Sequence, residues 1–162
     1  YGRELPRGEV GELWIHGGSV IKGYWNNPRA TAESFTAGYW HSGDLGSVDE
    51  QNFVRVFDRQ KDMINRGGLK IYSAEVESVL AGHPAVIESA IVARPCPVLG
   101  ERVHAVVVVR SDIDSPTLRA WCIERMSDYK VPETIDISTE PLPRNANGKV
   151  MKKNLRDNLM DS

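Results

Sequence analysis

The residues best placed for chemistry lie near the C-terminus, where a lysine follows a turn. Residues 145–149 read Asn-Ala-Asn-Gly-Lys, and they come directly after Pro143 and Arg144. Asn and Gly favour tight turns, and Pro ends regular structure, so Lys149 is predicted at a loop tip with its ammonium free to reach into a cleft. A solvated lysine on a hairpin is the alternative that this stretch alone leaves open.

Further motifs precede this lysine in a fixed order, and Lys149 closes the series. They are Tyr39-Trp40-His41-Ser42-Gly43-Asp44, Asp58-Arg59-Gln60-Lys61-Asp62, Asn65-Arg66-Gly67-Gly68-Leu69-Lys70-Ile71 and Ser73-Ala74-Glu75-Val76-Glu77. The arrangement resembles the C-terminal part of the adenylate-forming superfamily, which includes acyl- and aryl-CoA synthetases, the adenylation domains of peptide synthetases and firefly luciferase. The resemblance runs from Gly11 to Lys149.

The resemblance implies a reaction in two halves. A carboxylate attacks the α-phosphate of MgATP to give an acyl-adenylate and diphosphate, and the thiol of CoA then gives a thioester and AMP. Lys149 resembles the family lysine that bridges the carboxylate and the α-phosphate, where a compact ammonium offsets the charge of two approaching anions. ATP with Mg²⁺, CoA and a carboxylic acid are therefore the expected substrates of the complete enzyme, with no tightly bound cofactor in this chain.

Three residues are candidates for nucleotide binding. Asp44 resembles the family carboxylate that binds the two ribose hydroxyls, and its oxygens can only accept hydrogen bonds. Arg59 resembles an arginine that touches the ribose or a phosphate; from the residues alone, an ion pair to Asp58 or Asp62 is an equal alternative. Lys70 occupies a position that holds a basic or amide residue near the phosphate in some members of the family.

The resemblance also assigns a hinge and a thiol-binding segment. Lys61 matches the pivot of a large rotation between the two half-reactions, and it lies in a charged run without bulky apolar residues. Gly67 and Gly68 would let the backbone approach the pantetheine arm of CoA closely, as a narrow tunnel requires. A β-bulge or a tight turn explains the same glycine pair, and both roles are compatible.

Within the superfamily, residues 96–103 and 142–149 look most like fatty-acyl or related CoA ligases. A fatty acid is therefore the expected substrate. Two alternatives remain: a peptide-synthetase-type adenylation domain that loads a carrier protein, and a non-catalytic binding module, against which the joint presence of Asp44, Arg59 and Lys149 argues.

The expected fold class is α+β, with a domain boundary in the charged run. Residues 1–58 are predicted to be the end of a β-rich, barrel-like subdomain, and residues 59–162 a small mobile α+β domain with a central sheet and flanking helices. Val106 to Val109 form a continuous apolar run, which predicts a central strand covered on both faces. Asn27 with Pro28, and Ser73, are candidate helix N-caps or starts. The remaining predicted elements are strands at 12–16, 40–42, 45–48, 53–57, 86–93, 103–110 and 134–138, a strand pair at 63–71, and helices at 74–81, from Ser115, and at 152–159.

Composition excludes several other classes. The 162 residues are 41% hydrophobic and carry a net charge of −2, and the 20 basic residues are spread along the chain, so nucleic acid is not an expected partner. No apolar run approaches the roughly 20 residues of a membrane span, and the N-terminal residues Tyr-Gly-Arg-Glu-Leu-Pro lack the basic-then-apolar pattern of a signal sequence, so a cytoplasmic location is expected. Cys96, predicted in a loop, and Cys122, predicted on an apolar helix face, lack metal-ligand spacing, and no metal site is expected.

The chain also has features of a fragment. It begins at Tyr1 without an initiator Met, and it contains neither GxxxxGK[ST] nor GxGxxG. In the resembling family the phosphate-binding loop lies far upstream. This chain is therefore expected to need the missing N-terminal part of the same enzyme as its partner, and not to adenylate an acid alone.

Overall fold

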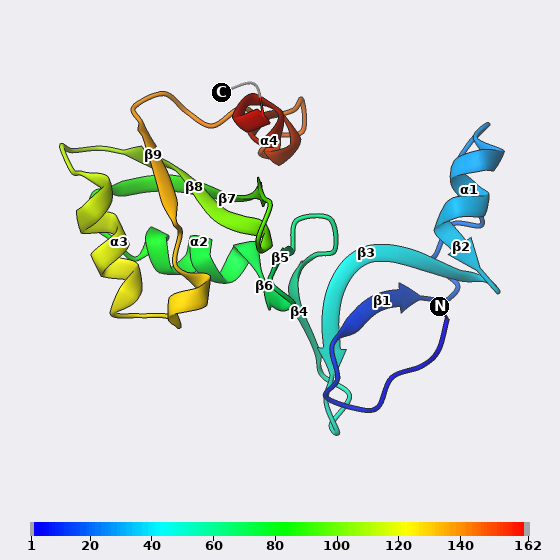
Figure 1. The fold of residues 1–162 in the computed structure, drawn as a ribbon. Helices are drawn as coiled ribbons and strands as arrows, with labels where there is room; N and C mark the ends of the chain where they lie inside the picture. The colour runs from blue at the N-terminus through cyan, green and yellow to red at the C-terminus, as the bar shows by residue number, and fades with distance from the viewer. Residues whose placement is uncertain (1, 161–162) are drawn as a thin grey trace. The chain divides into compact units, whose positions relative to one another are not determined.

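A computed structural model describes residues 2–160 (Figure 1). They divide into two compact units, and the division lies between Lys61 and Asp62. The division follows Lys61 directly, inside the charged run of residues 58–62. The first unit contains β1 (Gly11–Ile15), α1 (Pro28–Ser34), β2 (Phe35–Thr36), β3 (Tyr39–Val48) and β4 (Val54–Arg59). The second contains β5 (Ile64–Arg66), β6 (Leu69–Ile71), α2 (Ser73–Ala81), β7 (Val86–Cys96), β8 (Gly100–Val109), α3 (Ser115–Ile123), a 3₁₀ turn η1 (Asp128–Lys130), β9 (Thr134–Ser138) and α4 (Lys152–Met160).

The first unit is built around β3, with which β1, β2 and β4 each pair antiparallel. Two separate strands were predicted at 40–42 and 45–48, but they form one continuous strand, whose pairing with β1 shifts register beside Gly43 and whose pairing with β4 shifts register at Gly46. Among residues 2–61 these strands make an open sheet and not a closed barrel. The predicted helix start is confirmed: the side chain of Asn27 accepts a hydrogen bond from the Ala30 N–H at 3.0 Å, and Pro28 opens α1.

The second unit is built around β8. β7 pairs antiparallel with its full length, while β9 pairs parallel with residues 104–108 on the other edge. The β5–β6 hairpin continues that edge through a single backbone pair, Arg66 with Gly100. The strand predicted from Val106 to Val109 therefore is central, as its continuous apolar run indicated.

The two faces of this sheet are covered by different elements, as Figure 1 shows for α2 and α3 on one side and α4 on the other. Alternate β8 residues point to each face. Full burial of one Val, Leu or Ile side chain in these clusters stabilises the folded state by about 1.5–3 kcal/mol relative to exposure. The larger cluster contains Ile64, Ile71, Val76, Leu80, Val86, Ile91, Val103, Ala105, Val107, Val109, Leu118, Cys122 and Val131, and the smaller contains Ala90, Val108 and Leu142 with Val150 and Leu155 packed against it.

Two local predictions in the second unit need correction. The N-cap position of α2 is Tyr72 and not Ser73, and the Ser73 hydroxyl instead accepts a hydrogen bond from Lys152 Nζ at 2.7 Å. The predicted start of α3 at Ser115 is confirmed, and Asp114 caps this helix through its side chain, which accepts from the Thr117 N–H. Cys96 lies at the end of β7 and not in a loop, because β7 extends three residues beyond the predicted end.

Candidate functional site

Asp44 and Arg59 lie opposite each other on β3 and β4, as direct cross-strand partners. Arg59 Nη1 donates a hydrogen bond to Asp44 Oδ1 at 2.8 Å. The ion pair in the structure therefore joins two predicted nucleotide-binding residues to each other. Their side chains are 29% and 52% exposed, so the pair stays accessible to a ligand.

A glycine in the left-handed region sets the backbone before Asp44. Gly43 has φ +72°, which L-residues with a Cβ rarely adopt. Its N–H donates to Glu12 Oε1 at 3.1 Å, and its carbonyl accepts from the Gln60 N–H at 2.8 Å. The Asp44 N–H in turn donates to Ser42 Oγ at 3.0 Å. The Ser-Gly-Asp sequence thus makes a local bend in β3 that presents the Asp44 carboxylate.

Lys149 lies on a tight turn that the Asn145 side chain closes. Asn145 Oδ1 accepts from the N–H groups of Asn147 and Lys149, both at 3.0 Å, and the Asn145 N–H donates to the Lys149 carbonyl at 2.9 Å. Gly148 has φ +77° and accommodates the reversal. Lys149 is exposed, and within residues 2–160 its ammonium forms no ion pair or hydrogen bond.

The Lys149 turn is fixed to the sheet on both sides. Arg144 donates to the Gly148 carbonyl at 2.7 Å and pairs with Glu88 on β7. The other oxygen of Glu88 accepts from the Leu142 N–H at 2.9 Å. After the turn, Val150 packs with Leu142 in the smaller core cluster. The exposed lysine is thereby carried on a turn that is held on both sides.

Gly67 and Gly68 form the two-residue turn of the β5–β6 hairpin. Their φ values are +58° and +89°, the combination that a tight β-hairpin turn needs and that glycine supplies without steric cost. The backbone at the glycine pair therefore forms a tight turn, as one of the sequence interpretations predicted. Lys70 follows on β6, exposed and opposite Asn65.

Within the second unit, the lysine turn and the glycine turn are attached to different parts of the β7–β8 pair. The segment that leads into the lysine turn is attached at Glu88, which pairs with Val108. The Gly67 N–H donates to the Leu99 carbonyl at 2.7 Å, beside the end of the ladder at Cys96 and Gly100. Eight residues of β7, about 26 Å at the usual rise per residue, separate Glu88 from Cys96.

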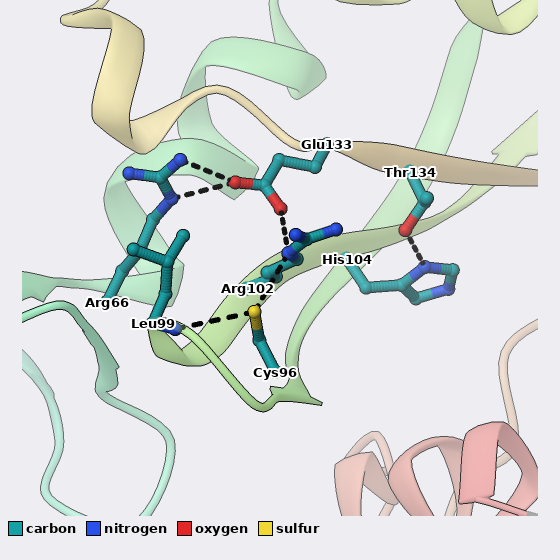
Figure 2. Close-up of polar contacts among 7 residues, drawn as sticks. All are labelled: Arg66, Cys96, Leu99, Arg102, His104, Glu133 and Thr134. Atoms are coloured by element: carbon teal, nitrogen blue, oxygen red, sulfur yellow. Dashed lines mark hydrogen bonds and ion pairs between the residues drawn. The ribbon is translucent and has the colours of Figure 1, made fainter.

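A polar cluster beside the glycine turn was not anticipated from the sequence (Figure 2). Arg66 Nη2 and Nε lie 2.6 and 2.8 Å from Glu133 Oε1, and Arg102 Nε lies 3.1 Å from Glu133 Oε2. Arg102 Nε also donates to Cys96 Sγ at 3.1 Å. The Leu99 N–H holds the pKa of the Cys96 thiol below its ordinary value, an effect that Arg102 reinforces and burial opposes. No spacing signal indicates the charged part of this cluster, because Arg66, Arg102 and Glu133 are 31 or more residues apart.

A second unanticipated polar group is His104, which is 1% exposed on β8. Its Nδ1 shares a hydrogen bond of 2.7 Å with Thr134 Oγ1, while its Nε2 lies 3.5 Å from Asp136 Oδ2 and makes no hydrogen bond with any described residue. Burial lowers the pKa of His104 below 6.5; Asp136 opposes this shift and Arg94 adds to it. The imidazole is therefore neutral in the folded unit.

This burial predicts an acid-sensitive second unit. The unfolded chain binds the His104 proton more readily than the folded chain, so stability is full above pH 6.5 and falls as the pH drops below it, by at most about 1.4 kcal/mol per pH unit for this one proton. Urea unfolding between pH 5.5 and 7.5, followed through NMR signals of β8, measures the slope. His104→Gln should flatten it, whereas His83→Gln, in the same unit, should retain it; equal slopes in the two variants would refute the assignment.

No helix within residues 2–160 has the length and apolar character needed to cross a membrane. No group of three or more His, Cys, Asp or Glu side chains in the same range is arranged to hold a metal ion.

The chain is similar in sequence to a known protein family. Residues 75–149, which end at Lys149, match the AMP-binding enzyme C-terminal domain. The chain is 45% identical over 157 residues to feruloyl-CoA synthase of Amycolatopsis sp., covering 96% of this chain and 32% of that protein. It is 39% identical over 158 residues to long-chain-fatty-acid–CoA ligase of Yersinia pestis, covering 96% and 28%.

The fold is similar to solved enzymes as well. The crystal structure of ATP-bound MatB from Rhodopseudomonas palustris aligns with a TM-score of 0.89 and 37% identity, covering 99% of this chain and 32% of that one. The chain thus spans about a third of the length of the relatives that it matches. On these grounds the chain belongs to the adenylate-forming superfamily and carries its AMP-binding enzyme C-terminal domain.

Proposed function

We propose that this chain is the C-terminal part of an ATP-dependent carboxylate–CoA ligase, which converts an acid, ATP and CoA into acyl-CoA, AMP and diphosphate through an acyl-adenylate. The observation that carries the proposal is Lys149, an exposed and unpaired ammonium among the described residues, held on a turn that is fixed to the sheet from both sides. A preorganised cation of this kind stabilises charge that builds up as a carboxylate approaches a phosphate. The chain alone is not expected to adenylate an acid.

The Asp44–Arg59 pair is the proposed nucleotide contact. A carboxylate has about four acceptor positions, so Asp44 can bind two ribose hydroxyls while one oxygen still accepts from Arg59. The arginine then holds the carboxylate in one orientation. Lys70 remains a proposed phosphate contact on the other unit, and MgATP is a substrate of the complete enzyme.

The separation of the two turns supports a two-step use of the second unit. Lys149 would serve adenylation, and Gly67 and Gly68 would line the path of the pantetheine arm in thioester formation. Because the lysine turn is anchored at Glu88 and the glycine turn at the Leu99 carbonyl, the proposal assigns each turn to one step. The unit would therefore have to rotate between the steps, and Lys61, at the division between the compact units, is the proposed pivot.

The acid and the acceptor are the finer parts of the proposal. A fatty acid is the substrate that we favour, on the resemblance of residues 96–103 and 142–149 to fatty-acyl-CoA ligases. Relatives are named for feruloyl, 2-succinylbenzoate and long-chain fatty acids, so other acids are alternatives. One structural neighbour is an amide bond synthetase, so the acceptor is open as well, and a carrier-bound thiol is the alternative to free CoA. A cytoplasmic location also remains a prediction.

An acid panel with the complete protein tests the function. Long-chain fatty acids, ferulate and 2-succinylbenzoate are supplied separately, and acid-dependent exchange between ATP and diphosphate reports adenylation. Free CoA and a phosphopantetheine-carrying protein are then compared as acceptors by the rate of thioester formation. We expect exchange with one acid class and transfer to free CoA; absence of exchange with every acid would leave the non-catalytic binding module as the better explanation.

A further inference from the structure

A closed ring of contacts passes through Gly67 of the glycine turn, and Figure 2 shows the part of it that joins Arg66, Glu133, Arg102, Cys96 and Leu99. It runs from Glu133 to the Arg66 side chain and along the chain to Gly67, whose N–H donates to the Leu99 carbonyl. The Leu99 N–H donates to Cys96 Sγ at 3.4 Å, Cys96 accepts from Arg102, and Arg102 returns to Glu133. The ring therefore holds the turn from its own strand and from the connection between β7 and β8.

Glu133 is the junction of this ring. One carboxylate oxygen binds Arg66 from β5 through two nitrogens, and the other lies against Arg102 from β8. The Glu133 side chain is 22% exposed and that of Arg66 25%, so water screens the Arg66 pair less than a surface ion pair. Its backbone is fixed too, because the Glu133 N–H donates to the Val103 carbonyl at 2.9 Å. Loss of its charge would leave two guanidinium groups without their shared anion.

The glycine turn depends on these contacts because strand pairing alone holds it weakly. The hairpin base is anchored by Ile64 and Ile71, both fully buried, but the tip joins the sheet through only one backbone pair. Gly67 and Gly68 have the widest conformational freedom of any residue type. Three further contacts hold the tip: the ion pair between Arg66 and Glu133, the hydrogen bond from the Gly67 N–H to the Leu99 carbonyl, and the hydrogen bond from the Asn65 N–H to Glu101 Oε2.

We propose that Glu133 is a positioning residue for thioester formation, acting through Arg66 on the Gly67-Gly68 turn. The inference rests on the proposed function, in which this turn lines the path of the pantetheine arm. A small displacement of a positioning element lowers a reaction rate strongly, because the thiol no longer meets the adenylate in a productive orientation. Adenylation does not use this turn and is independent of Glu133.

Single-turnover kinetics of both half-reactions in the complete protein test the inference. Glu133→Gln keeps the side-chain size and removes the charge. With the acid that supports exchange, we expect thioester formation from supplied acyl-adenylate to slow about tenfold and to need more CoA for half-maximal rate, with adenylation unchanged. Glu124→Gln is the matched control, since it removes a carboxylate that pairs with Arg125 on the exposed surface of the same unit.

A second measurement reads the turn itself in this chain. Hydrogen exchange of the Gly67 amide should accelerate about tenfold in Glu133→Gln and in Arg66→Gln, and the double substitution should add little, because the two act through one contact. Unchanged exchange at Gly67 would overturn the inference. So would equal losses in both half-reactions, or an unaltered thiol step in an enzyme that is otherwise active. An unsubstituted protein that forms neither adenylate nor thioester would instead refute the proposed function.

Discussion

Replacing Lys149 with alanine should slow acyl-adenylate formation in the complete protein by at least about 10²-fold, the order expected for loss of one preorganised electrostatic contact. Thioester formation from supplied acyl-adenylate should change little. The reason is structural: the ammonium is exposed and unpaired within residues 2–160, and its turn is held by Asn145, Arg144 and Glu88. Single-turnover measurement of each step separates the two effects.

The control for this prediction is Lys153→Ala. Lys153 is an exposed lysine on α4, four residues beyond Lys149, and its substitution removes the same charge from the same unit. We expect both half-reactions to proceed in this variant at the unsubstituted rates. An unimpaired adenylation rate in Lys149→Ala would contradict the catalytic role and leave Lys149 as a surface residue of a hairpin.

Replacing Lys61 with proline should block the exchange between the two half-reactions. Proline restricts φ to about −65° and removes the backbone N–H, so the chain at the division between the compact units could no longer rotate freely. Adenylation should survive, while thioester formation from preformed adenylate should fall by at least about tenfold. The lysine turn is anchored at Glu88 on β7 and the glycine turn at the β7–β8 connection, which is why the second step should depend on rotation.

Lys61→Ala is the matched variant for the hinge. It removes the side chain and leaves φ unrestricted, so both steps should continue near their normal rates if backbone rotation is what matters. Equal losses of adenylation and thioester formation in Lys61→Pro would indicate ordinary destabilisation. Urea unfolding of the two variants checks that explanation independently.

The sequence by itself determined those features of this protein that depend on neighbouring residues. The Asn27 cap, the turn before Lys149 and the two-residue glycine turn are each set by side chains or backbone freedom within about five residues. The continuous apolar run from Val106 to Val109 likewise announced a central strand, because only such a strand is covered on both faces. Ordered motifs then sufficed to indicate the superfamily.

Only the tertiary structure decided which distant side chains meet. Arg59 pairs with Asp44 because the register of β3 and β4 places them opposite each other. From the sequence, Asp58 and Asp62 were the candidate ion-pair partners of Arg59. Glu133 meets Arg66 and Arg102 because the short β5 and the parallel β9 share one edge of β8. The length of β7 places Cys96 in a strand, and the packing of the same sheet buries His104. Such contacts depend on strand register and order, which arise from the burial of the whole core and leave no local pattern in the chain.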